Sequence, residues 1–218
     1  MTSTVYHVSP NSSLIAQLCD KYGSDKDSER VAGVSYASAP HTYAWVYSSL
    51  FEHCRHEFRK VFECGIGTTN VQIASNMGSG GKPGASLRVW RDYFPNATIF
   101  GADIDQSVLF GEDRIATFHV DQTDPTSVFR MWRMMGEQEF DLMIDDGLHE
   151  FAAGVCLFEN SRDKLREGGV YVIEDIQLRD LLRYHRYFHE QRLSADFFMM
   201  VQPFENSLDN SLIVLRKQ

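Results

Sequence analysis

Short apolar runs alternate with amphipathic segments along most of the chain after residue 60. The runs with the length and composition of buried strands cover 61–66, 97–104, 115–120, 140–145 and 169–175. The segments between them that favour helices cover 71–76, 86–94, 125–135 and 151–165. Strands that are apolar almost throughout and separated by helices predict a parallel sheet covered on both faces.

Two more strands are predicted near the carboxyl end, at 196–202 and 211–217, after a helix over 178–191. The link between them, PFENSLDN, is too short for a crossover helix, so they should form an antiparallel hairpin at the edge of the sheet. We therefore expect an α/β fold with a Rossmann-like, doubly wound sheet of seven strands, mostly parallel with a C-terminal antiparallel hairpin.

The N-terminal part of the chain predicts helices and a long polar loop. Asn11 or Ser12 can cap a helix that ends before Gly23, and a second helix is predicted over 41–56. A loop as long as the one between them is more often a binding segment than a linker. We expect one domain, in which residues 1–56 form an N-terminal helical and lid segment and residues 57–218 form the main body.

Composition and charge narrow the class of partner. The 218 residues carry a formal net charge of −9 without a basic stripe that could neutralise phosphates, so nucleic acid is not expected as a partner. The four cysteines lack C-x-x-C spacing and suit a reducing compartment. The N-terminus has neither a signal-peptide pattern nor a run long enough to span a bilayer, so we expect a cytoplasmic protein with no membrane partner.

Polar residues follow the predicted strands where ligands of an open α/β sheet bind, beyond the carboxyl ends. Glycines would let the backbone approach a ligand closely. Asp103 could bind both hydroxyls of a ribose. Asp105 could bind them instead, or either acid could cap the next helix. The third glycine of a dinucleotide fingerprint is missing, which counts against NAD. The predicted cofactor-binding residues of these strand ends are Glu63, Gly65, Gly67, Asp103, Asp121, Gln122 and Asp145.

Two pairs of carboxylates, Asp145 with Asp146 and Glu174 with Asp175, follow strands that should be neighbours. Carboxylate oxygens are the ligands that Mg²⁺ or Mn²⁺ prefers, so Asp146, Glu174 and Asp175 are the predicted metal ligands. They could instead be solvated caps, but four converging carboxylates without a cation would repel one another. His149 lies close enough along the chain to act as a general base, and we predict His149 and Asp146 as catalytic residues.

A series of motifs runs through most of the chain in order. They are YGSDK at 22–26, HTYAWVY at 41–47, ECGIG at 63–67, GASLRVWRDYFP at 84–95, GADID at 101–105, IDDGLH at 144–149 and VIED at 172–175. In these the chain resembles the class I S-adenosylmethionine-dependent methyltransferases, and within them the sugar O-methyltransferases of macrolide antibiotic biosynthesis, of the mycinamicin and demethylmacrocin type. Leu148 stands where that family's pattern has serine.

The resemblance implies S-adenosylmethionine as the cofactor and Mg²⁺ held by the three acids named above, with His149 as base. It adds Ser24 and Arg88 to the cofactor-binding residues and makes 57–218 a methyltransferase domain. Tyr36, Tyr43 and Tyr47 could line the acceptor pocket, although ordinary packing is the simpler role for each.

The predicted function is metal-dependent transfer of a methyl group from S-adenosylmethionine to a hydroxyl of a sugar or glycosylated natural product, with a homodimer formed through edge strands. Three alternatives stay open. A catechol-type O-methyltransferase would use the same strand ends, and an N-methyltransferase of amino sugars would not need the metal ion. The third is a Rossmann-type binding module or nicotinamide oxidoreductase, which would bind NAD instead.

Overall fold

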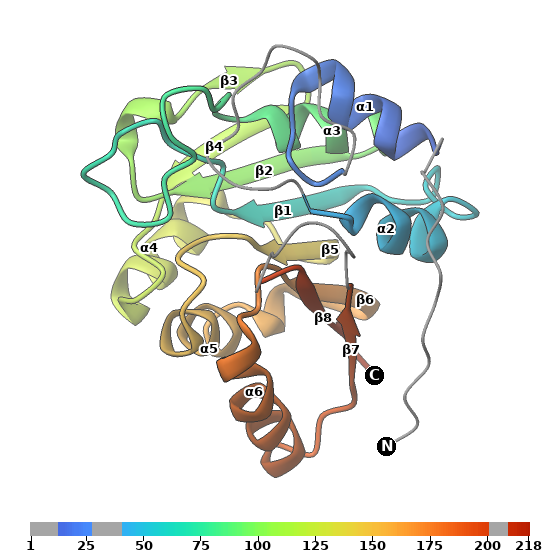
Figure 1. The fold of residues 1–218 in the computed structure, drawn as a ribbon, viewed down its shortest axis with the longest axis vertical. Helices are drawn as coiled ribbons and strands as arrows, with labels where there is room; N and C mark the ends of the chain where they lie inside the picture. The colour runs from blue at the N-terminus through green and yellow to red at the C-terminus, as the bar shows by residue number, and fades with distance from the viewer. Residues whose placement is uncertain (1–12, 28–40, 201–208) are drawn as a thin grey trace.

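The computed structural model describes residues 13–27, 41–200 and 209–218, and they form a sheet with helices on both faces (Figure 1). The strands are β1 (Lys60–Cys64), β2 (Thr98–Asp103), β3 (Gly111–Glu112), β4 (Ile115–His119), β5 (Phe140–Asp145), β6 (Leu165–Ile173), β7 (Ala195–Met199) and β8 (Ser211–Arg216). The helices are α1 (Leu14–Tyr22), α2 (Tyr43–Phe51), α3 (Ala85–Tyr93), α4 (Pro125–Met135), α5 (Phe151–Glu159) and α6 (Leu178–Glu190), with short 3₁₀ helices at Gln106–Val108 and Arg162–Lys164.

The strand order of the described sheet is β3-β4-β2-β1-β5-β6-β8-β7. Strands β4, β2, β1, β5 and β6 run parallel, and β8 pairs antiparallel with both β6 and β7. The Rossmann-like fold with antiparallel C-terminal strands is therefore confirmed. The predicted strand number was one too low, because β3 is a two-residue strand paired with β4 and has no apolar run of its own.

Two hydrophobic cores lie on opposite faces of the sheet, because successive residues of a strand point to opposite sides. In β1, Val61 belongs to the core with α1, α2 and α3, whereas Phe62 belongs to the core with α4, α5 and α6. Figure 1 shows the same separation, with α1 and α3 on one side of the sheet and α4, α5 and α6 on the other. The N-terminal helices therefore pack on the same core as the sheet.

Side-chain caps begin α1 and α4, and several other predicted helices differ from those in the structure. Helix α1 is capped by Ser13, whose side chain accepts a hydrogen bond from the backbone N–H of Ala16, rather than by Asn11 or Ser12, which lie outside the described residues. Helix α4 has the predicted bounds. The helix predicted at 71–76 is wrong, because this stretch forms turns. Helices α2 and α5 are shorter than predicted.

None of the helices in the described part of the chain is long and apolar enough to cross a bilayer.

Candidate active site

The carboxyl ends of β1, β5 and β6 meet at the centre of the sheet, where the chain order reverses. The chain adds β2 and β4 on one side of β1 and then returns to add β5 on its other side. Backbone pairing continues past the strand ends: the Asp146 N–H donates to the Cys64 carbonyl at 2.8 Å, and the Glu174 N–H donates to the Asp145 carbonyl at 2.9 Å. The acids that follow β5 and β6 are therefore held side by side, in the place where such folds bind ligands.

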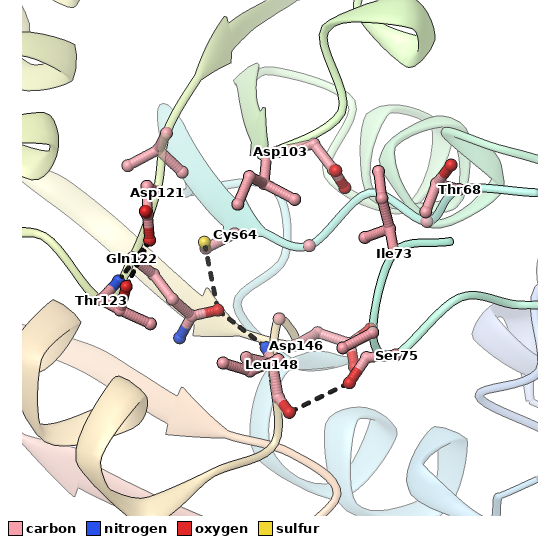
Figure 2. A pocket seen from close by; sticks show the side chains of 16 residues that line it. Cys64, Thr68, Ile73, Ser75, Asp103, Asp121, Gln122, Thr123, Asp146 and Leu148 are labelled. Carbon is pink, nitrogen blue, oxygen red and sulfur yellow. Dashed lines mark hydrogen bonds between the residues drawn. The ribbon is translucent and has the colours of Figure 1, made fainter. Parts of the chain in front are cut away.

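A cavity of about 270 Å³ opens at these strand ends (Figure 2). Its walls come from the turns after β1, β2, β4 and β5 and from the segment 73–75. Six of the predicted site residues line it: Gly65, Gly67, Asp103, Asp121, Gln122 and Asp146. Most of the cofactor-binding residues predicted at strand ends therefore line the same cavity.

Gly65 has no room for a side chain. A Cβ atom at this position would lie 1.9 Å from the carbonyl oxygen of Asp146, and the residue has a φ of +86°. The turn after β1 therefore passes directly against the turn after β5. Only glycine combines this close approach with this backbone conformation at little cost.

Asp103, the last residue of β2, and Asp105, two residues later, have different hydrogen-bond partners. Asp105 caps the 3₁₀ helix at Gln106–Val108, and its oxygens accept hydrogen bonds from Ser107 and Thr68. Asp103 accepts from the backbone N–H groups of Ile66 and Asp105, both at 2.9 Å, and lines the cavity. Burial raises the pKa of Asp103, and these backbone hydrogen bonds oppose the shift. Asp103 is the acid available to a ligand.

Gln122 connects the turns that surround the cavity. Its Oε1 accepts from the Leu148 N–H at 2.8 Å, and its Nε2 donates to Asp145 Oδ1 at 3.1 Å. Ser75 donates to the Leu148 carbonyl at 3.0 Å from the opposite wall, as Figure 2 shows. The amide of Gln122 is therefore occupied in holding the turn after β5 in position.

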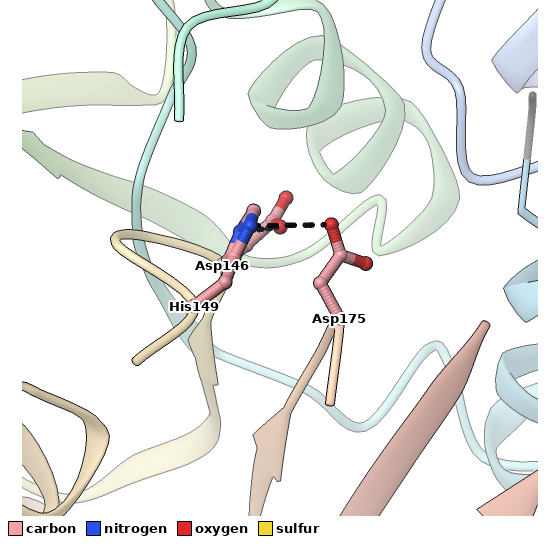
Figure 3. Close-up of side chains that lie close together, drawn as sticks. All are labelled: Asp146, His149 and Asp175. Carbon is pink, nitrogen blue, oxygen red and sulfur yellow. Dashed lines mark hydrogen bonds and ion pairs between the residues drawn. The ribbon is translucent and has the colours of Figure 1, made fainter. Parts of the chain in front are cut away.

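Asp146, His149 and Asp175 form a cluster beside the cavity (Figure 3). One possible ligand atom from each lies within 4.8 Å of the others. His149 Nε2 is 3.3 Å from Asp146 Oδ1, and His149 Nδ1 is 3.6 Å from Asp175 Oδ2. His149 and Asp175 both have positive φ, +59° and +54°, a conformation that costs energy outside glycine and that often occurs at functional sites.

The imidazole of His149 is held in its charged form by these acids. Burial alone would lower its pKa, but Asp175 and Asp146 outweigh that effect and raise the pKa to about 10. A cation bound between the same carboxylates would neutralise part of their negative charge. The pKa of His149 would then move back toward the range in which imidazole can accept a proton.

Lys26, which was not among the predicted site residues, lies at the centre of the site. Its side chain is 2% exposed, and its Nζ lies 2.6 Å from Asp146 Oδ2 and 3.2 Å from Glu63 Oε1 and also pairs with Glu174. Burial would lower the pKa of Lys26, but the three carboxylates outweigh it and hold the pKa well above its usual value. The only signal in the sequence was the position of Lys26 inside the YGSDK motif at 22–26.

The remaining acids of the site are held by tyrosines. Tyr47 donates a hydrogen bond to Glu174, and the Tyr43 hydroxyl donates to Asp175 Oδ1 at 2.7 Å while accepting from the Asp175 N–H at 3.2 Å. Tyr43 and Tyr47 are at most 1% exposed. They support the carboxylates from the core and, in this structure, do not form an open surface for an acceptor. Tyr36 lies outside the described residues.

Four other predicted residues lie away from the cavity wall. Arg88 is ion-paired with Glu112 at 2.6 Å on the surface, so the structure does not bring it to the site. Glu63 is fully buried and accepts from Ser86 at 2.6 Å. Ser24 is buried in the turn before Lys26. Asp145 points to the opposite face of the sheet from the acid cluster, and burial raises its pKa to about 6.

Solved structures share this fold and the arrangement of its elements. The MycE methyltransferase of the mycinamycin biosynthetic pathway, solved with Mg and S-adenosylhomocysteine, superposes with a TM-score of 0.68 at 23% identity over 96% of this chain and 56% of that one. The structure titled cmcI-D160 Mg-SAM superposes with a TM-score of 0.53 at 19% identity, over 91% of this chain and 84% of that one. The chain therefore has the Rossmann-like methyltransferase fold.

Proteins with higher sequence identity show which kind of methyltransferase the chain resembles. The chain is 33% identical over 163 residues to the 8-demethyl-8-alpha-L-rhamnosyl tetracenomycin-C 2'-O-methyltransferase of Streptomyces olivaceus, covering 75% of this chain and 38% of that protein. It is 35% identical over 136 residues to the mycinamicin VI 2''-O-methyltransferase of Micromonospora griseorubida, covering 62% of this chain and 32% of that protein. The predicted resemblance to sugar O-methyltransferases is confirmed, although the chain spans less than half the length of these relatives. No protein-family model matches the chain.

Proposed function

We propose that this chain is a metal-dependent O-methyltransferase that transfers a methyl group from S-adenosylmethionine to a sugar hydroxyl of a glycosylated natural product. The observation that carries the proposal is the position of Asp146. It lines the cavity and is also a member of the acid and histidine cluster. A ligand in the cavity and a cation at the cluster would therefore be immediate neighbours.

The cavity fits the cofactor by its chemistry. Asp103 presents a buried carboxylate after β2, where it could accept hydrogen bonds from ribose hydroxyls, and the glycine turn at Gly65 allows close approach of the backbone. Asp121 lies on the wall formed after β4. The missing third glycine of the dinucleotide pattern makes NAD a poorer match.

The cluster fits a divalent ion with oxygen ligands. Asp146 and Asp175 supply carboxylate oxygens close enough to share one ion. The third proposed ligand, Glu174, precedes Asp175 in the chain and contacts Lys26 and Tyr47 in this structure. These are the hard ligands preferred by Mg²⁺ and Mn²⁺. His149 also belongs to the cluster, but we assign it to proton transfer rather than to the ion.

When bound, S-adenosylmethionine would supply an activated methyl group and the ion would lower the pKa of an acceptor hydroxyl. His149 then takes the hydroxyl proton, with its ring oriented by Asp146 and Asp175. Asp103 and the cavity turns fix the cofactor in place. Tyr43 and Tyr47 keep the carboxylates oriented, which favours a fixed geometry for the reacting groups.

The acceptor class is proposed from the relatives, whose names specify rhamnosyl tetracenomycin and mycinamicin as substrates. A role in antibiotic biosynthesis is part of the same proposal. We further propose residues 1–56 as an N-terminal helical and lid segment of the same domain as the methyltransferase part, 57–218. A cytoplasmic location and a homodimer are also proposed. The absence of a nucleic-acid partner stays a prediction from the net charge.

The test separates cofactor binding from turnover. Asp146→Ala should keep the affinity for S-adenosylhomocysteine within about threefold in calorimetry but lower methyl transfer to a rhamnosylated acceptor by at least about a hundredfold, because the ion loses a ligand. Chelation of divalent ions should likewise stop the parental enzyme. Asp113→Ala, at a side chain 91% exposed, is the matched control. If Asp146→Ala loses cofactor affinity and turnover equally, Asp146 is not an ion ligand.

A further inference from the structure

Lys26 is a buried cation surrounded by the carboxylates of the proposed ion site. It follows the end of α1, and its ammonium reaches across to the ends of β5 and β6. The partners are Asp146, Glu174 and Glu63, all within ion-pair distance. Burying a lysine this completely is costly unless its charge is compensated, so this contact is a built feature of the site.

The backbone around Lys26 is fixed from both sides. The N–H groups of Gly23 and Ser24 both donate to the carbonyl of Cys19, and these hydrogen bonds close the C-terminal end of α1. The carbonyl of Lys26 accepts from the Ala44 N–H at 3.0 Å, and this bond ties the segment to α2. A change in the side-chain conformation of Lys26 is the simplest way for the ammonium to leave the carboxylates.

Lys26 contacts one oxygen of each of two proposed ion ligands. These oxygens are Oδ2 of Asp146 and Oε2 of Glu174. The other carboxylate oxygen of Glu174 accepts a hydrogen bond from Tyr47. Glu174 thus has a partner on each oxygen without any ion.

We propose that Lys26 is an internal counter-ion of this site: it holds Asp146 and Glu174 together when no ion is bound, and a divalent ion must displace it. This inference rests on the proposed metal site and concerns how that site is controlled. Lys26 is a positioning residue, because it acts through the carboxylates. Its charge lowers the affinity for the ion, since one cation must replace or approach another at a distance of a few ångströms.

The experiment measures ion binding directly, without a methyl acceptor. Protein freed of ions with a chelator is titrated with Mn²⁺ by calorimetry, and its melting temperature is recorded with and without the ion. Lys26→Met removes the charge and keeps most of the apolar stem. Lys26→Arg keeps the charge, and Lys21→Met makes the same change at a lysine that is 56% exposed and paired with Asp92.

We expect Lys26→Met to bind Mn²⁺ at least about tenfold more tightly than the parental protein. Without the ion its melting temperature should fall, because two buried carboxylates and the half-buried Asp146 lose their cation. The ion should restore the melting temperature by a larger shift than in the parental protein. Lys26→Arg and Lys21→Met should stay within about threefold of the parental affinity. Equal affinity for Lys26→Met and the parental protein would overturn the role of Lys26 and leave the metal site standing.

A second measurement uses the unmodified protein, in case Lys26→Met does not fold. Reductive methylation of lysines, followed by mass spectrometry of peptides, should modify Lys26 slowly without Mn²⁺ and at least about tenfold faster at saturation, while Lys21 reacts at the same rate in both. An unchanged rate at Lys26 in protein that binds Mn²⁺ overturns the displacement. If neither the parental protein nor Lys26→Met binds Mn²⁺, the metal site itself is wrong and the inference falls with it.

Discussion

Replacing Tyr47 with phenylalanine tests whether the site acids are held in place by the core. The Tyr47 hydroxyl donates to Glu174, and both side chains are at most 1% exposed. The ring packs edge-on against Trp90 with 4.8 Å between centroids, and phenylalanine would keep this contact. The substitution therefore removes one hydroxyl and one hydrogen bond and leaves the apolar packing in place.

The magnitude follows from the burial of the acceptor. Removing the donor of a buried acceptor costs about 1–3 kcal/mol, because the acceptor cannot recover the hydrogen bond from water. We expect Tyr47→Phe to lower the free energy of unfolding by about 1–3 kcal/mol. Urea denaturation followed by circular dichroism measures this value, provided that the m-value is unchanged.

Tyr171 is the matched control, because it undergoes the same chemical change at a similar burial. Its hydroxyl is buried on the other face of the sheet, and no hydrogen-bond partner is found for it among the described residues. Removal of an unsatisfied buried hydroxyl is close to neutral or stabilising, so Tyr171→Phe should change stability by less than about 0.5 kcal/mol. Equal losses for the two variants would refute the reasoning, since the loss would then be general to tyrosine burial.

Two further predictions concern the glycine turn and an acid on the surface. Gly65→Ala should lower the free energy of unfolding by at least about 3 kcal/mol, because its Cβ would overlap the Asp146 carbonyl. Gly136 has a similar φ and open space around it, so Gly136→Ala should lower the free energy of unfolding by only about 1 kcal/mol in the same denaturation assay. Burial would raise the pKa of Asp92, but hydrogen bonds from Tyr22 and two basic side chains outweigh it and lower the pKa to about 2. The stability that Asp92 contributes is present above its ordinary pKa of 3.8 and is lost as the pH falls toward 2. Asp92→Asn should therefore flatten the fall of melting temperature with pH in that range, and parallel curves for the variant and the parental protein would contradict this.

Local patterns in the sequence were sufficient to predict most of the fold. Helix α4 has the predicted bounds because Asp124 and Pro125 begin it and Gly136 ends it, and these are local signals. The short strand β3 and the turns at 71–76 were missed because neither depends on a periodic apolar pattern. A tight antiparallel pairing with the first residues of β4 makes the first a strand, and the cavity wall includes part of the second.

The sequence also predicted which strand ends carry the site, but not how adjacent acids divide between its parts. Asp145 and Asp146 are neighbours in the chain and point to opposite faces, because side chains alternate along an extended backbone. Only Asp146 can join the cluster. Asp175 reaches it through a backbone with positive φ, a conformation that no sequence pattern of this chain indicates.

The sequence by itself determined the parallel sheet, the order of its elements and the acids at its carboxyl edge, since strands, caps and turns depend on residues close together in the chain. Only the tertiary structure placed Lys26 against Asp146 and Glu174, which lie 120 and 148 positions further along. It also placed Tyr47 against Glu174 and Tyr43 against Asp175. Contacts between segments so far apart depend on how α1 and α2 pack on the sheet, and the charge balance of the site follows from that packing.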